Sequence, residues 1–200
     1  MNYQSQALQD RFVANITKFK RDGYYLDIGS CDAISTNNTF CFEGLGWKGI
    51  CIEIDGAHNN SYSKRTCKYI NDDATKLDYS HILAESNAPK TIDYLSLDID
   101  HLSTIVLERL PLDDYRFNVI TIEHDYYIHG GIYRDAQRKL LAASGYILLF
   151  EDVLVPITHD TKPDCSFEDW WVHKDFVIPD IEKIKGGNNL YPDQIISKFS

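Results

Sequence analysis

The stretch YYLDIGSCDAISTNNTF, from Tyr24 to Phe40, decides the fold. Its apolar start predicts a buried strand that ends in an acid–X–glycine turn at Asp27 and Gly29 and then leads into a helix. A second apolar run, GICIEI at 49–54, ends in another acid, Glu53. Open α/β sheets bind ligands beyond the carboxyl ends of their strands. The pattern therefore predicts a nucleoside site, in which the glycine admits the ligand and the second acid accepts ribose hydroxyls.

The turn after the first strand favours one class of nucleoside cofactor over another. A nicotinamide-binding fold would need G-x-G-x-x-G here, to bring a helix N-terminus against a pyrophosphate. This turn has one glycine, Gly29, and an added carboxylate, Asp32, which repels a pyrophosphate but suits a cation. S-adenosylmethionine carries a sulfonium and an ammonium and no phosphate, so the electrostatics favour S-adenosylmethionine over NAD. The alternative is a plain strand–turn–helix in which Asp27 and Asp32 only cap and solvate.

Length and charge set limits on the whole chain. Its 200 residues suit a single domain, 1–200, with an N-terminal helix within 1–20 and a peripheral tail at 186–200; whether it is part of a larger chain stays open. With 30 acidic and 20 basic side chains the net charge is -10, which we expect to disfavour nucleic acid and anionic membrane. No apolar stretch predicts membrane insertion or a signal peptide. An odd number of cysteines without CxxC favours reduced thiols and a cytoplasmic location.

Apolar periodicity predicts strands that alternate with helices along most of the chain. The expected helices are 7–19, 36–45, 57–65, 79–88, 103–110 and 133–144. The expected strands are 24–28, 49–54, 67–72, 92–99, 118–127, 146–153 and 169–176. The last two strands have only a loop between them, so a mostly parallel sheet should finish in an antiparallel hairpin.

Several short segments together make the chain resemble FkbM-type methyltransferases, a branch of the class I S-adenosylmethionine-dependent enzymes. They are SQALQD (5–10), GYYLDIGSCDAISTNNT (23–39), LGWKGICIE (45–53), IDYLSLDID (92–100), ITIEHDYY (120–127), GY (145–146) and DWWV (169–172). The resemblance implies a Rossmann-like α/β sandwich with a mostly parallel seven-stranded sheet in the order 3-2-1-4-5-7-6 and helices on both faces. It also implies O-methylation, often of sugars, glycans or related natural products.

The resemblance implies a set of cofactor-binding residues. Asp27 and Gly29 would lie beside the methionine part, Glu53 at the ribose, and acids at 72 and 73 near the adenine. The whole set is Gln6, Asp27, Gly29, Ser30, Asp32, Asn38, Thr39, Glu53, Ile54, Asp72, Asp73, Ala74 and Asp98. The chain departs from the family pattern twice. Ala33 replaces a glycine, and Asp98-Ile99-Asp100-His101 stands where members often have Asp-X-Glu-Gly.

Methyl transfer to a hydroxyl needs a general base or a metal, because an alcohol is a poor nucleophile near neutral pH. We expect the catalytic groups at the ends of the fourth and fifth strands, where Asp98, Glu123 and His124 fall. A divalent metal, Mn²⁺ or Mg²⁺, would be held by Asp98, Glu123 and either His124 or Asp125. A metal-free alternative makes His124 the base. In a purely structural alternative His124 is a buried, hydrogen-bonded histidine and Glu123 pairs with an arginine or lysine of the next helix.

The acceptor pocket is expected to include Asp100, Tyr127, His129 and Tyr133, since aromatic faces stack on sugar rings. The sequence therefore favours an O-methyltransferase acting on a carbohydrate hydroxyl, with a 6-deoxyhexose such as rhamnose as the specific prediction. The expected partner is a glycan or sugar and not a nucleic acid. The alternatives are methylation of another small metabolite or a protein, and a non-catalytic accessory module that keeps the cofactor fold. The sequence gives no indication of the oligomeric state.

Overall fold

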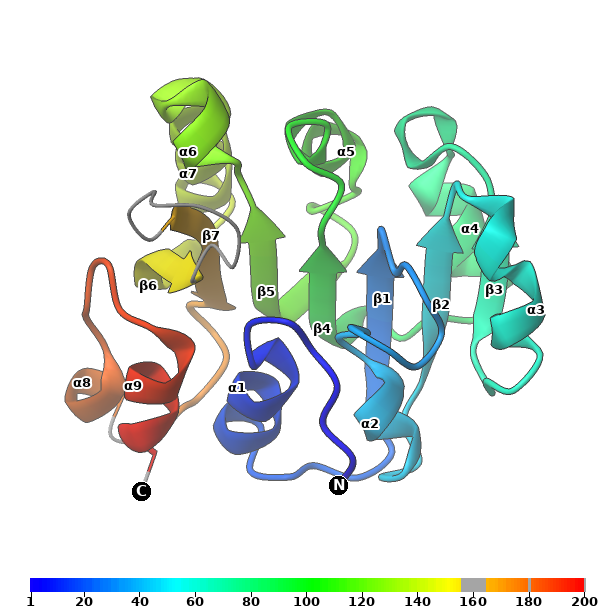
Figure 1. Ribbon diagram of the computed structural model, residues 1–200, viewed down its shortest axis with the longest axis horizontal. Coiled ribbons are helices and arrows are strands. Elements are labelled where there is room, and N and C mark those ends of the chain that lie inside the picture. The colour runs from blue at the N-terminus through cyan, green and yellow to red at the C-terminus, as the bar shows by residue number, and fades with distance from the viewer. Residues whose placement is uncertain (156–164, 180, 200) are drawn as a thin grey trace.

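The computed structural model describes residues 1–155, 165–179 and 181–199. Within them the strands form one sheet in the order β3-β2-β1-β4-β5-β7-β6 (Figure 1). This confirms the predicted Rossmann-like fold class and strand order. The strands are β1 Tyr24–Ile28, β2 Lys48–Glu53, β3 Lys68–Asn71, β4 Thr91–Leu97, β5 Arg116–Glu123, β6 Tyr146–Val155 and β7 Cys165–His173.

The direction of the strands explains where a ligand can bind. The neighbours from β3 to β5 all pair in parallel, and β7 pairs antiparallel with both β5 and β6. The carboxyl ends of β1, β2, β4 and β5 therefore meet along one edge of the sheet, at the top of Figure 1, which is called here the ligand edge. The predicted terminal hairpin is present as well.

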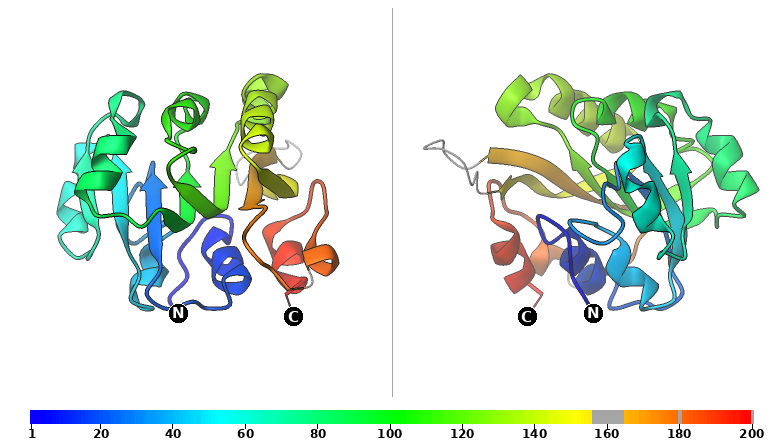
Figure 2. Two further views of the ribbon diagram at one scale, coloured as in Figure 1. Left: turned by 180° about the vertical axis from the view of Figure 1, so that it is seen from behind. Right: turned by 45° about the vertical axis from the view of Figure 1, so that its right-hand side comes forward.

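Helices cover both faces of the sheet. Figure 2 shows α4, α5 and α7 on one face and α1, α2 and α9 on the other. The helical segments are α1 Gln9–Ile16, α2 Phe40–Glu43, η1 Gly56–His58, α3 Asn59–Tyr62, η2 Ala74–Lys76, α4 Tyr79–Glu85, α5 Ser103–Arg109, α6 Tyr126–His129, α7 Gly131–Ala143, α8 Ile181–Ile184 and α9 Pro192–Ser197. None of these described helices is both long and apolar enough to cross a membrane.

Two hydrophobic clusters lie on opposite faces of the sheet because successive strand residues point to opposite sides. On β1, Leu26 and Ile28 join the cluster under α4, α5 and α7, whereas Tyr25 joins the cluster under α1 and α2. In the second cluster Phe12 stacks on the fully buried Trp170, with ring centroids 4.4 Å apart. This packing on both faces holds the strand ends of the ligand edge in fixed positions.

Among the differences from the expected structure, two bear on the site and on the core. The fifth strand ends at Glu123 rather than at 127, because Asp125 has a left-handed backbone (φ +49°) that breaks the extended chain, and α6 begins directly after it. The segment expected to be a peripheral tail contains α9, whose Ile195 is fully buried and packs in the α1 cluster.

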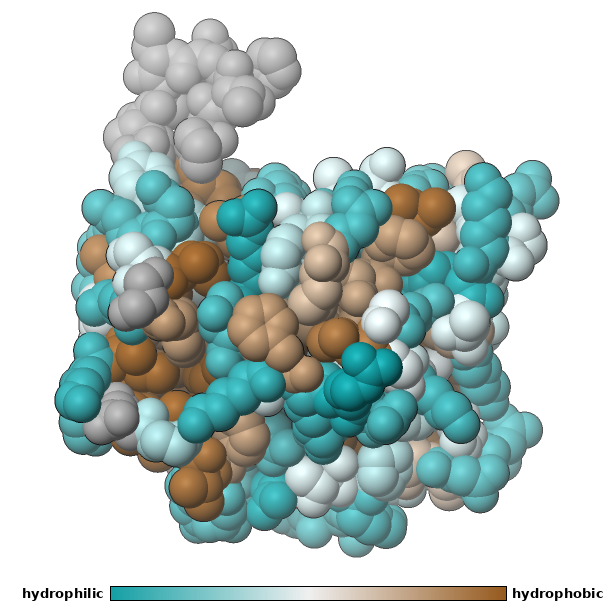
Figure 3. Space-filling view, turned by 90° about the horizontal axis from the view of Figure 1, so that it is seen from below, coloured by the Kyte–Doolittle hydropathy of each residue, from teal (hydrophilic) through white to brown (hydrophobic). Residues whose placement is uncertain are grey.

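The face opposite the ligand edge is mostly hydrophilic. Figure 3 views the molecule from below, where the parallel strands begin, and hydrophobic residues show there in separate groups among polar ones. Gly29 and the acids that end β2 and β5 lie at the other end of the sheet.

Candidate cofactor and acceptor site

The backbone of Gly29 packs closely against the backbone of Asp98, at the ends of β1 and β4. Its N–H donates to the Ile52 carbonyl oxygen at 2.9 Å, and its φ of +78° lies in the left-handed region that favours glycine. A Cβ atom on this residue would lie 2.7 Å from the carbonyl carbon of Asp98 and closer still to its oxygen. Only a residue without a side chain fits at this position, and Gly29 lines two cavities.

The first cavity, called here the Asp27 cavity, has a volume of about 190 Å³. It is lined by Gln6, Asp27, Gly29, Ser30, Cys31, Thr36, Asn38 and Asp98. The Asp27 carboxylate is 1% exposed and accepts a hydrogen bond from Thr39 Oγ1 at 2.7 Å. Burial raises the pKa of Asp27 to about 6, although the Thr39 hydrogen bond and the nearby Arg65 oppose the rise. A cation beside Asp27 would favour its ionised form.

The second cavity, called here the Glu53 cavity, has a volume of about 240 Å³. It is lined by Gly29, Ile52, Glu53, Ile54, Asp72, Asp73, Ala74, Thr75, Ile99, Asp100 and Leu102. The Glu53 carboxylate accepts the N–H groups of Cys31 and Asp55, each at 2.8 Å, which fixes its orientation at the end of β2. Exposed Ile54 and Leu102 give the cavity apolar surface. A fixed acid beside apolar walls suits a ribose with its base.

Asp32 and Thr39, also expected to bind the cofactor, are not among the residues that line these two cavities. Asp32 accepts the N–H groups of Ile34 and Ser35 at 3.0 and 2.9 Å, and these hydrogen bonds lower its pKa. Thr39 donates to Asp27 from behind the cavity wall. Both side chains make hydrogen bonds that support the loop between β1 and α2.

The N-terminal segment lies across the same loop. Buried Asp10 accepts the N–H groups of Gln4 and Ser5 at 2.6 and 3.1 Å, and Ser5 pairs with Thr36 in an isolated parallel bridge. This arrangement places Gln6 at the Asp27 cavity. The acid therefore anchors the segment, and the glutamine faces the ligand space.

Arg65 anchors the loop between β1 and α2, and the sequence analysis assigned no role to this residue. Its buried guanidinium donates through Nη1 to the Ala33 carbonyl at 2.7 Å and to Asn37 Oδ1 at 3.0 Å. Through Nη2 it donates to the Tyr25 hydroxyl at 3.0 Å and to Thr39 Oγ1 at 3.2 Å. One side chain thus links β1 to both ends of the loop that walls the Asp27 cavity.

Asp98 and Glu123 form a hydrogen-bonded acid pair at the ends of β4 and β5. Burial raises the pKa of both groups, and the charge of Asp98 raises that of Glu123 further. The Asp100 N–H also donates to Glu123 Oε2 at 3.0 Å. Near neutral pH the pair therefore holds a proton, which makes it a poorer pair of metal ligands than two free carboxylates.

The structure does not bring His124 together with Glu123. His124 is fully buried, its Nδ1 accepts the Tyr126 N–H at 3.2 Å, and its Nε2 lies 3.6 Å from Asp169 Oδ1 and 3.7 Å from Asp152 Oδ1. The strand alternation persists to this position, so the ring points toward β6 and β7. The placement corrects the expected ligand set and the expected base, and it agrees with the alternative of a buried, hydrogen-bonded histidine.

The expected acceptor residues lie beyond the acid pair. Asp100 lines the Glu53 cavity, and Tyr127 is 48% exposed on α6. His129 and Tyr133 pack their rings together with a centroid distance of 5.2 Å, and His101 joins them at 5.2 and 5.4 Å. His101 was not among the expected site residues. The sequence feature that could have indicated His101 is the departure from Asp-X-Glu-Gly, because His101 stands where that pattern has glycine.

Comparison with known proteins bears on the fold. No family model and no curated protein matches the chain. A protein from Pyrococcus horikoshii, provisionally described as an RNA methyltransferase, has a TM-score of 0.55 and 13% identity over 84% of this chain and 81% of its own. One from Klebsiella pneumoniae, provisionally described as an O-methyltransferase, has a TM-score of 0.55 and 14% identity over 86% and 83%. The Dnmt2 methyltransferase of S. pombe has a TM-score of 0.54 and 13% identity over 82% and 54%. The chain therefore has a methyltransferase fold.

The expectation that nucleic acid is excluded as a partner is wrong. Structures that share this fold include the Pyrococcus protein described as an RNA methyltransferase. A net charge of -10 sums over the whole surface, whereas a nucleic acid meets only the local surface beside the site. The expected glycan or sugar partner loses the support that it drew from the charge.

Proposed function

We propose that the chain is an S-adenosylmethionine-dependent methyltransferase that transfers the methyl group to a hydroxyl oxygen. The observation that carries the proposal is the bare backbone at Gly29 between two acid-lined cavities. The fold alone would accept several nucleosides. The acids of both cavities disfavour a pyrophosphate and favour a ligand with positive charge.

Each cavity suits one part of this cofactor. When bound, S-adenosylmethionine supplies a methyl group on a positively charged sulfur. Asp27 would pair with the ammonium of the methionine part, and that cation would hold Asp27 ionised. Glu53 would accept the ribose hydroxyls, and Ile54 with Leu102 would contact the adenine. Because its oxygens are already fixed by two backbone N–H groups, Glu53 needs no reorganisation on binding.

The acceptor proton would go to Asp98. This residue lines the Asp27 cavity and contacts Glu123, and burial raises its pKa, which makes it a stronger base than an exposed carboxylate. Transfer forms an oxygen–carbon bond, breaks the carbon–sulfur bond and moves the hydroxyl proton to Asp98. A divalent metal would assist by lowering the pKa of the acceptor hydroxyl.

Binding and turnover are tested separately. Isothermal titration with S-adenosylmethionine should give a complex that Asp27→Asn and Glu53→Gln each weaken by about tenfold or more, which corresponds to about 1.4 kcal/mol. Glu85→Gln, on the exposed face of α4, is the matched control and should bind like the wild type. Binding of NAD in place of S-adenosylmethionine would contradict the proposal.

Turnover is measured as methyl transfer from labelled donor to a panel of acceptors. The panel includes glycosides, because a carbohydrate hydroxyl is the acceptor that the sequence led us to expect, and an RNA, because the fold is shared with a protein described as an RNA methyltransferase. Tight cofactor binding with no transfer to any acceptor, with or without added Mn²⁺, would favour the accessory module.

A further inference from the structure

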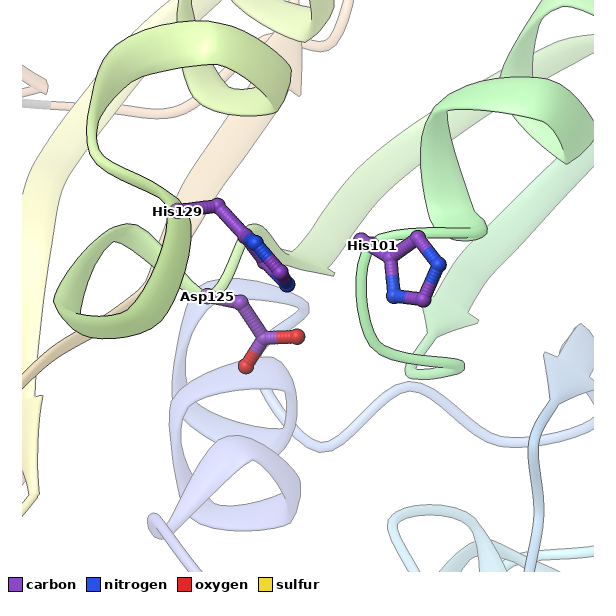
Figure 4. A group of neighbouring side chains, drawn as sticks. All are labelled: His101, Asp125 and His129. Atoms are coloured by element: carbon purple, nitrogen blue, oxygen red, sulfur yellow. The ribbon is translucent and has the colours of Figure 1, made fainter.

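Two histidines and a buried carboxylate converge at the ligand edge of the sheet. His101 lies in the segment between β4 and α5, Asp125 lies between β5 and α6, and His129 is the last residue of α6. Figure 4 shows the His129 ring and the Asp125 carboxylate side by side, with the His101 ring on the neighbouring loop. One ligand atom from each lies within 4.8 Å of the others. Segments that are distant in sequence thus build one small polar site.

Asp125 shows an unsatisfied bonding capacity in this site. The residue is 1% exposed, and its Oδ1 has no hydrogen-bond partner among the residues that the structure describes. Leaving a buried carboxylate oxygen without a donor costs stability, and the cost is larger for a charged group. A cation between Asp125 and the two imidazoles would supply the missing interaction.

The neighbouring charges favour a cation as well. Asp125 also forms a group with Asp100 and Glu123, again with ligand atoms within 4.8 Å of one another. No described arginine or lysine forms an ion pair with Asp125. The negative potential at this end of β5 is therefore not neutralised by the part of the chain that the structure describes.

The other histidine–carboxylate group, His124 with Asp152 and Asp169, differs in this respect. Arg138 Nε donates to Asp169 Oδ2 at 2.7 Å, and Arg134 Nη1 lies 3.1 Å from Asp152 Oδ1. Its carboxylates already have cationic partners. A metal ion there would be repelled by two guanidinium groups.

We propose that His101, Asp125 and His129 bind a divalent first-row transition metal in preference to Mg²⁺. Two imidazoles and one carboxylate suit Mn²⁺, Fe²⁺, Co²⁺ or Zn²⁺, whereas Mg²⁺ prefers oxygen ligands and keeps several waters. Of the expected ligands the site retains Asp125, and two histidines stand in place of Asp98, Glu123 and His124.

A metal ion bound by His101, Asp125 and His129 would lie close to both cavities. Asp100, next to His101, lines the Glu53 cavity, and Asp98 lines the Asp27 cavity. The site therefore borders the place where a methyl group and its acceptor would meet. The assistance to methyl transfer rests on the proposed function, whereas the binding of the metal does not.

Metal binding is tested on the full chain by titration with Co²⁺, followed by visible absorption, and by calorimetry with Mn²⁺, Zn²⁺ and Mg²⁺. The wild type should give a saturating Co²⁺ spectrum and bind Mg²⁺ at least about a hundredfold more weakly. His101→Ala, His129→Ala and Asp125→Asn should each weaken Co²⁺ binding by about tenfold or more. Circular dichroism checks that each variant is folded.

Two histidine variants serve as controls. His81→Ala, exposed on α4, and His124→Gln, in the arginine-paired group, should both bind Co²⁺ like the wild type. Absence of a Co²⁺ spectrum in the wild type would overturn the proposal, as would loss of binding in His124→Gln but not in His101→Ala. Calorimetry with S-adenosylmethionine on the same proteins separates the two proposals. Co²⁺ binding without binding of S-adenosylmethionine would support the metal site and contradict the proposed function.

Discussion

A Cβ atom built on Gly29 would lie 1.8 Å from the carbonyl oxygen of Asp98. The atom it meets is backbone, so no side-chain rotation relieves the contact. Gly29→Ala should therefore separate the ends of β1 and β4, destabilise the fold by about 1–3 kcal/mol and abolish S-adenosylmethionine binding. Denaturant unfolding and calorimetry measure the two effects. Gly44→Ala is the control, since Gly44 has helical backbone angles and its Cβ would meet only Cys41 oxygen at 3.4 Å.

Asp27 links pH to stability. Burial raises its pKa to about 6 from an ordinary value of 3.8, so the ionised carboxyl costs stability as pH rises through this window. Asp27→Asn should leave the free energy of unfolding unchanged near pH 4 and raise it at pH 7 by up to about 3 kcal/mol. The same variant should lose cofactor affinity. Equal stability of the variant and the wild type at both pH values would contradict the assignment.

The acid pair of Asp98 and Glu123 predicts unequal effects of two isosteric variants. The hydrogen bond between the two carboxyls raises the pKa of Glu123 and lowers that of Asp98, so Glu123→Gln keeps a donor toward Asp98 and an acceptor for the Asp100 N–H. We expect it to retain transfer within about tenfold, whereas Asp98→Asn removes the base and should lower kcat by about a hundredfold or more. Single-turnover kinetics give both values. The reverse order would assign the base to Glu123.

The guanidinium of Arg138 predicts a stability effect without an effect on the cofactor. Burial alone would raise the pKa of Asp169, but the hydrogen bonds from the Arg138 guanidinium lower it instead. The depressed pKa contributes stability above the ordinary carboxyl range, and this is lost as pH falls. Arg138→Met should cost about 3–5 kcal/mol at pH 7, because it leaves a buried charge unpaired, and less at acidic pH. Arg138→Lys keeps a charge and should cost less.

The fold and the position of the cavities at the carboxyl ends of the strands were predictable because they depend on local patterns. Alternation of apolar residues fixes strands such as β1, and an acid or glycine at a strand end follows from the sheet edge that parallel strands share. Asp27, Gly29 and Glu53 could be located from that pattern: Asp27 and Glu53 each line one cavity, and Gly29 lines both.

The acceptor side was less predictable because it depends on loops. The left-handed backbone of Asp125 ends β5 early, and no periodic pattern indicates it. His101 and His129 belong to different segments, and their rings meet only through the tertiary contact between α6 and the segment that joins β4 to α5. His124 was read as free to converge with Glu123, but the sheet hydrogen bond from its N–H to the Phe167 carbonyl keeps it in register with β7.

The contacts of Arg65 have a consequence for the speed and strength of ligand capture. Because the guanidinium joins β1 to Ala33, Asn37 and Thr39, the wall of the Asp27 cavity is rigid before anything enters it. An arriving molecule then loses its own freedom of motion but need not immobilise the receptor. Without the Arg65 guanidinium, the loop between β1 and α2 would have to become ordered as the ligand binds.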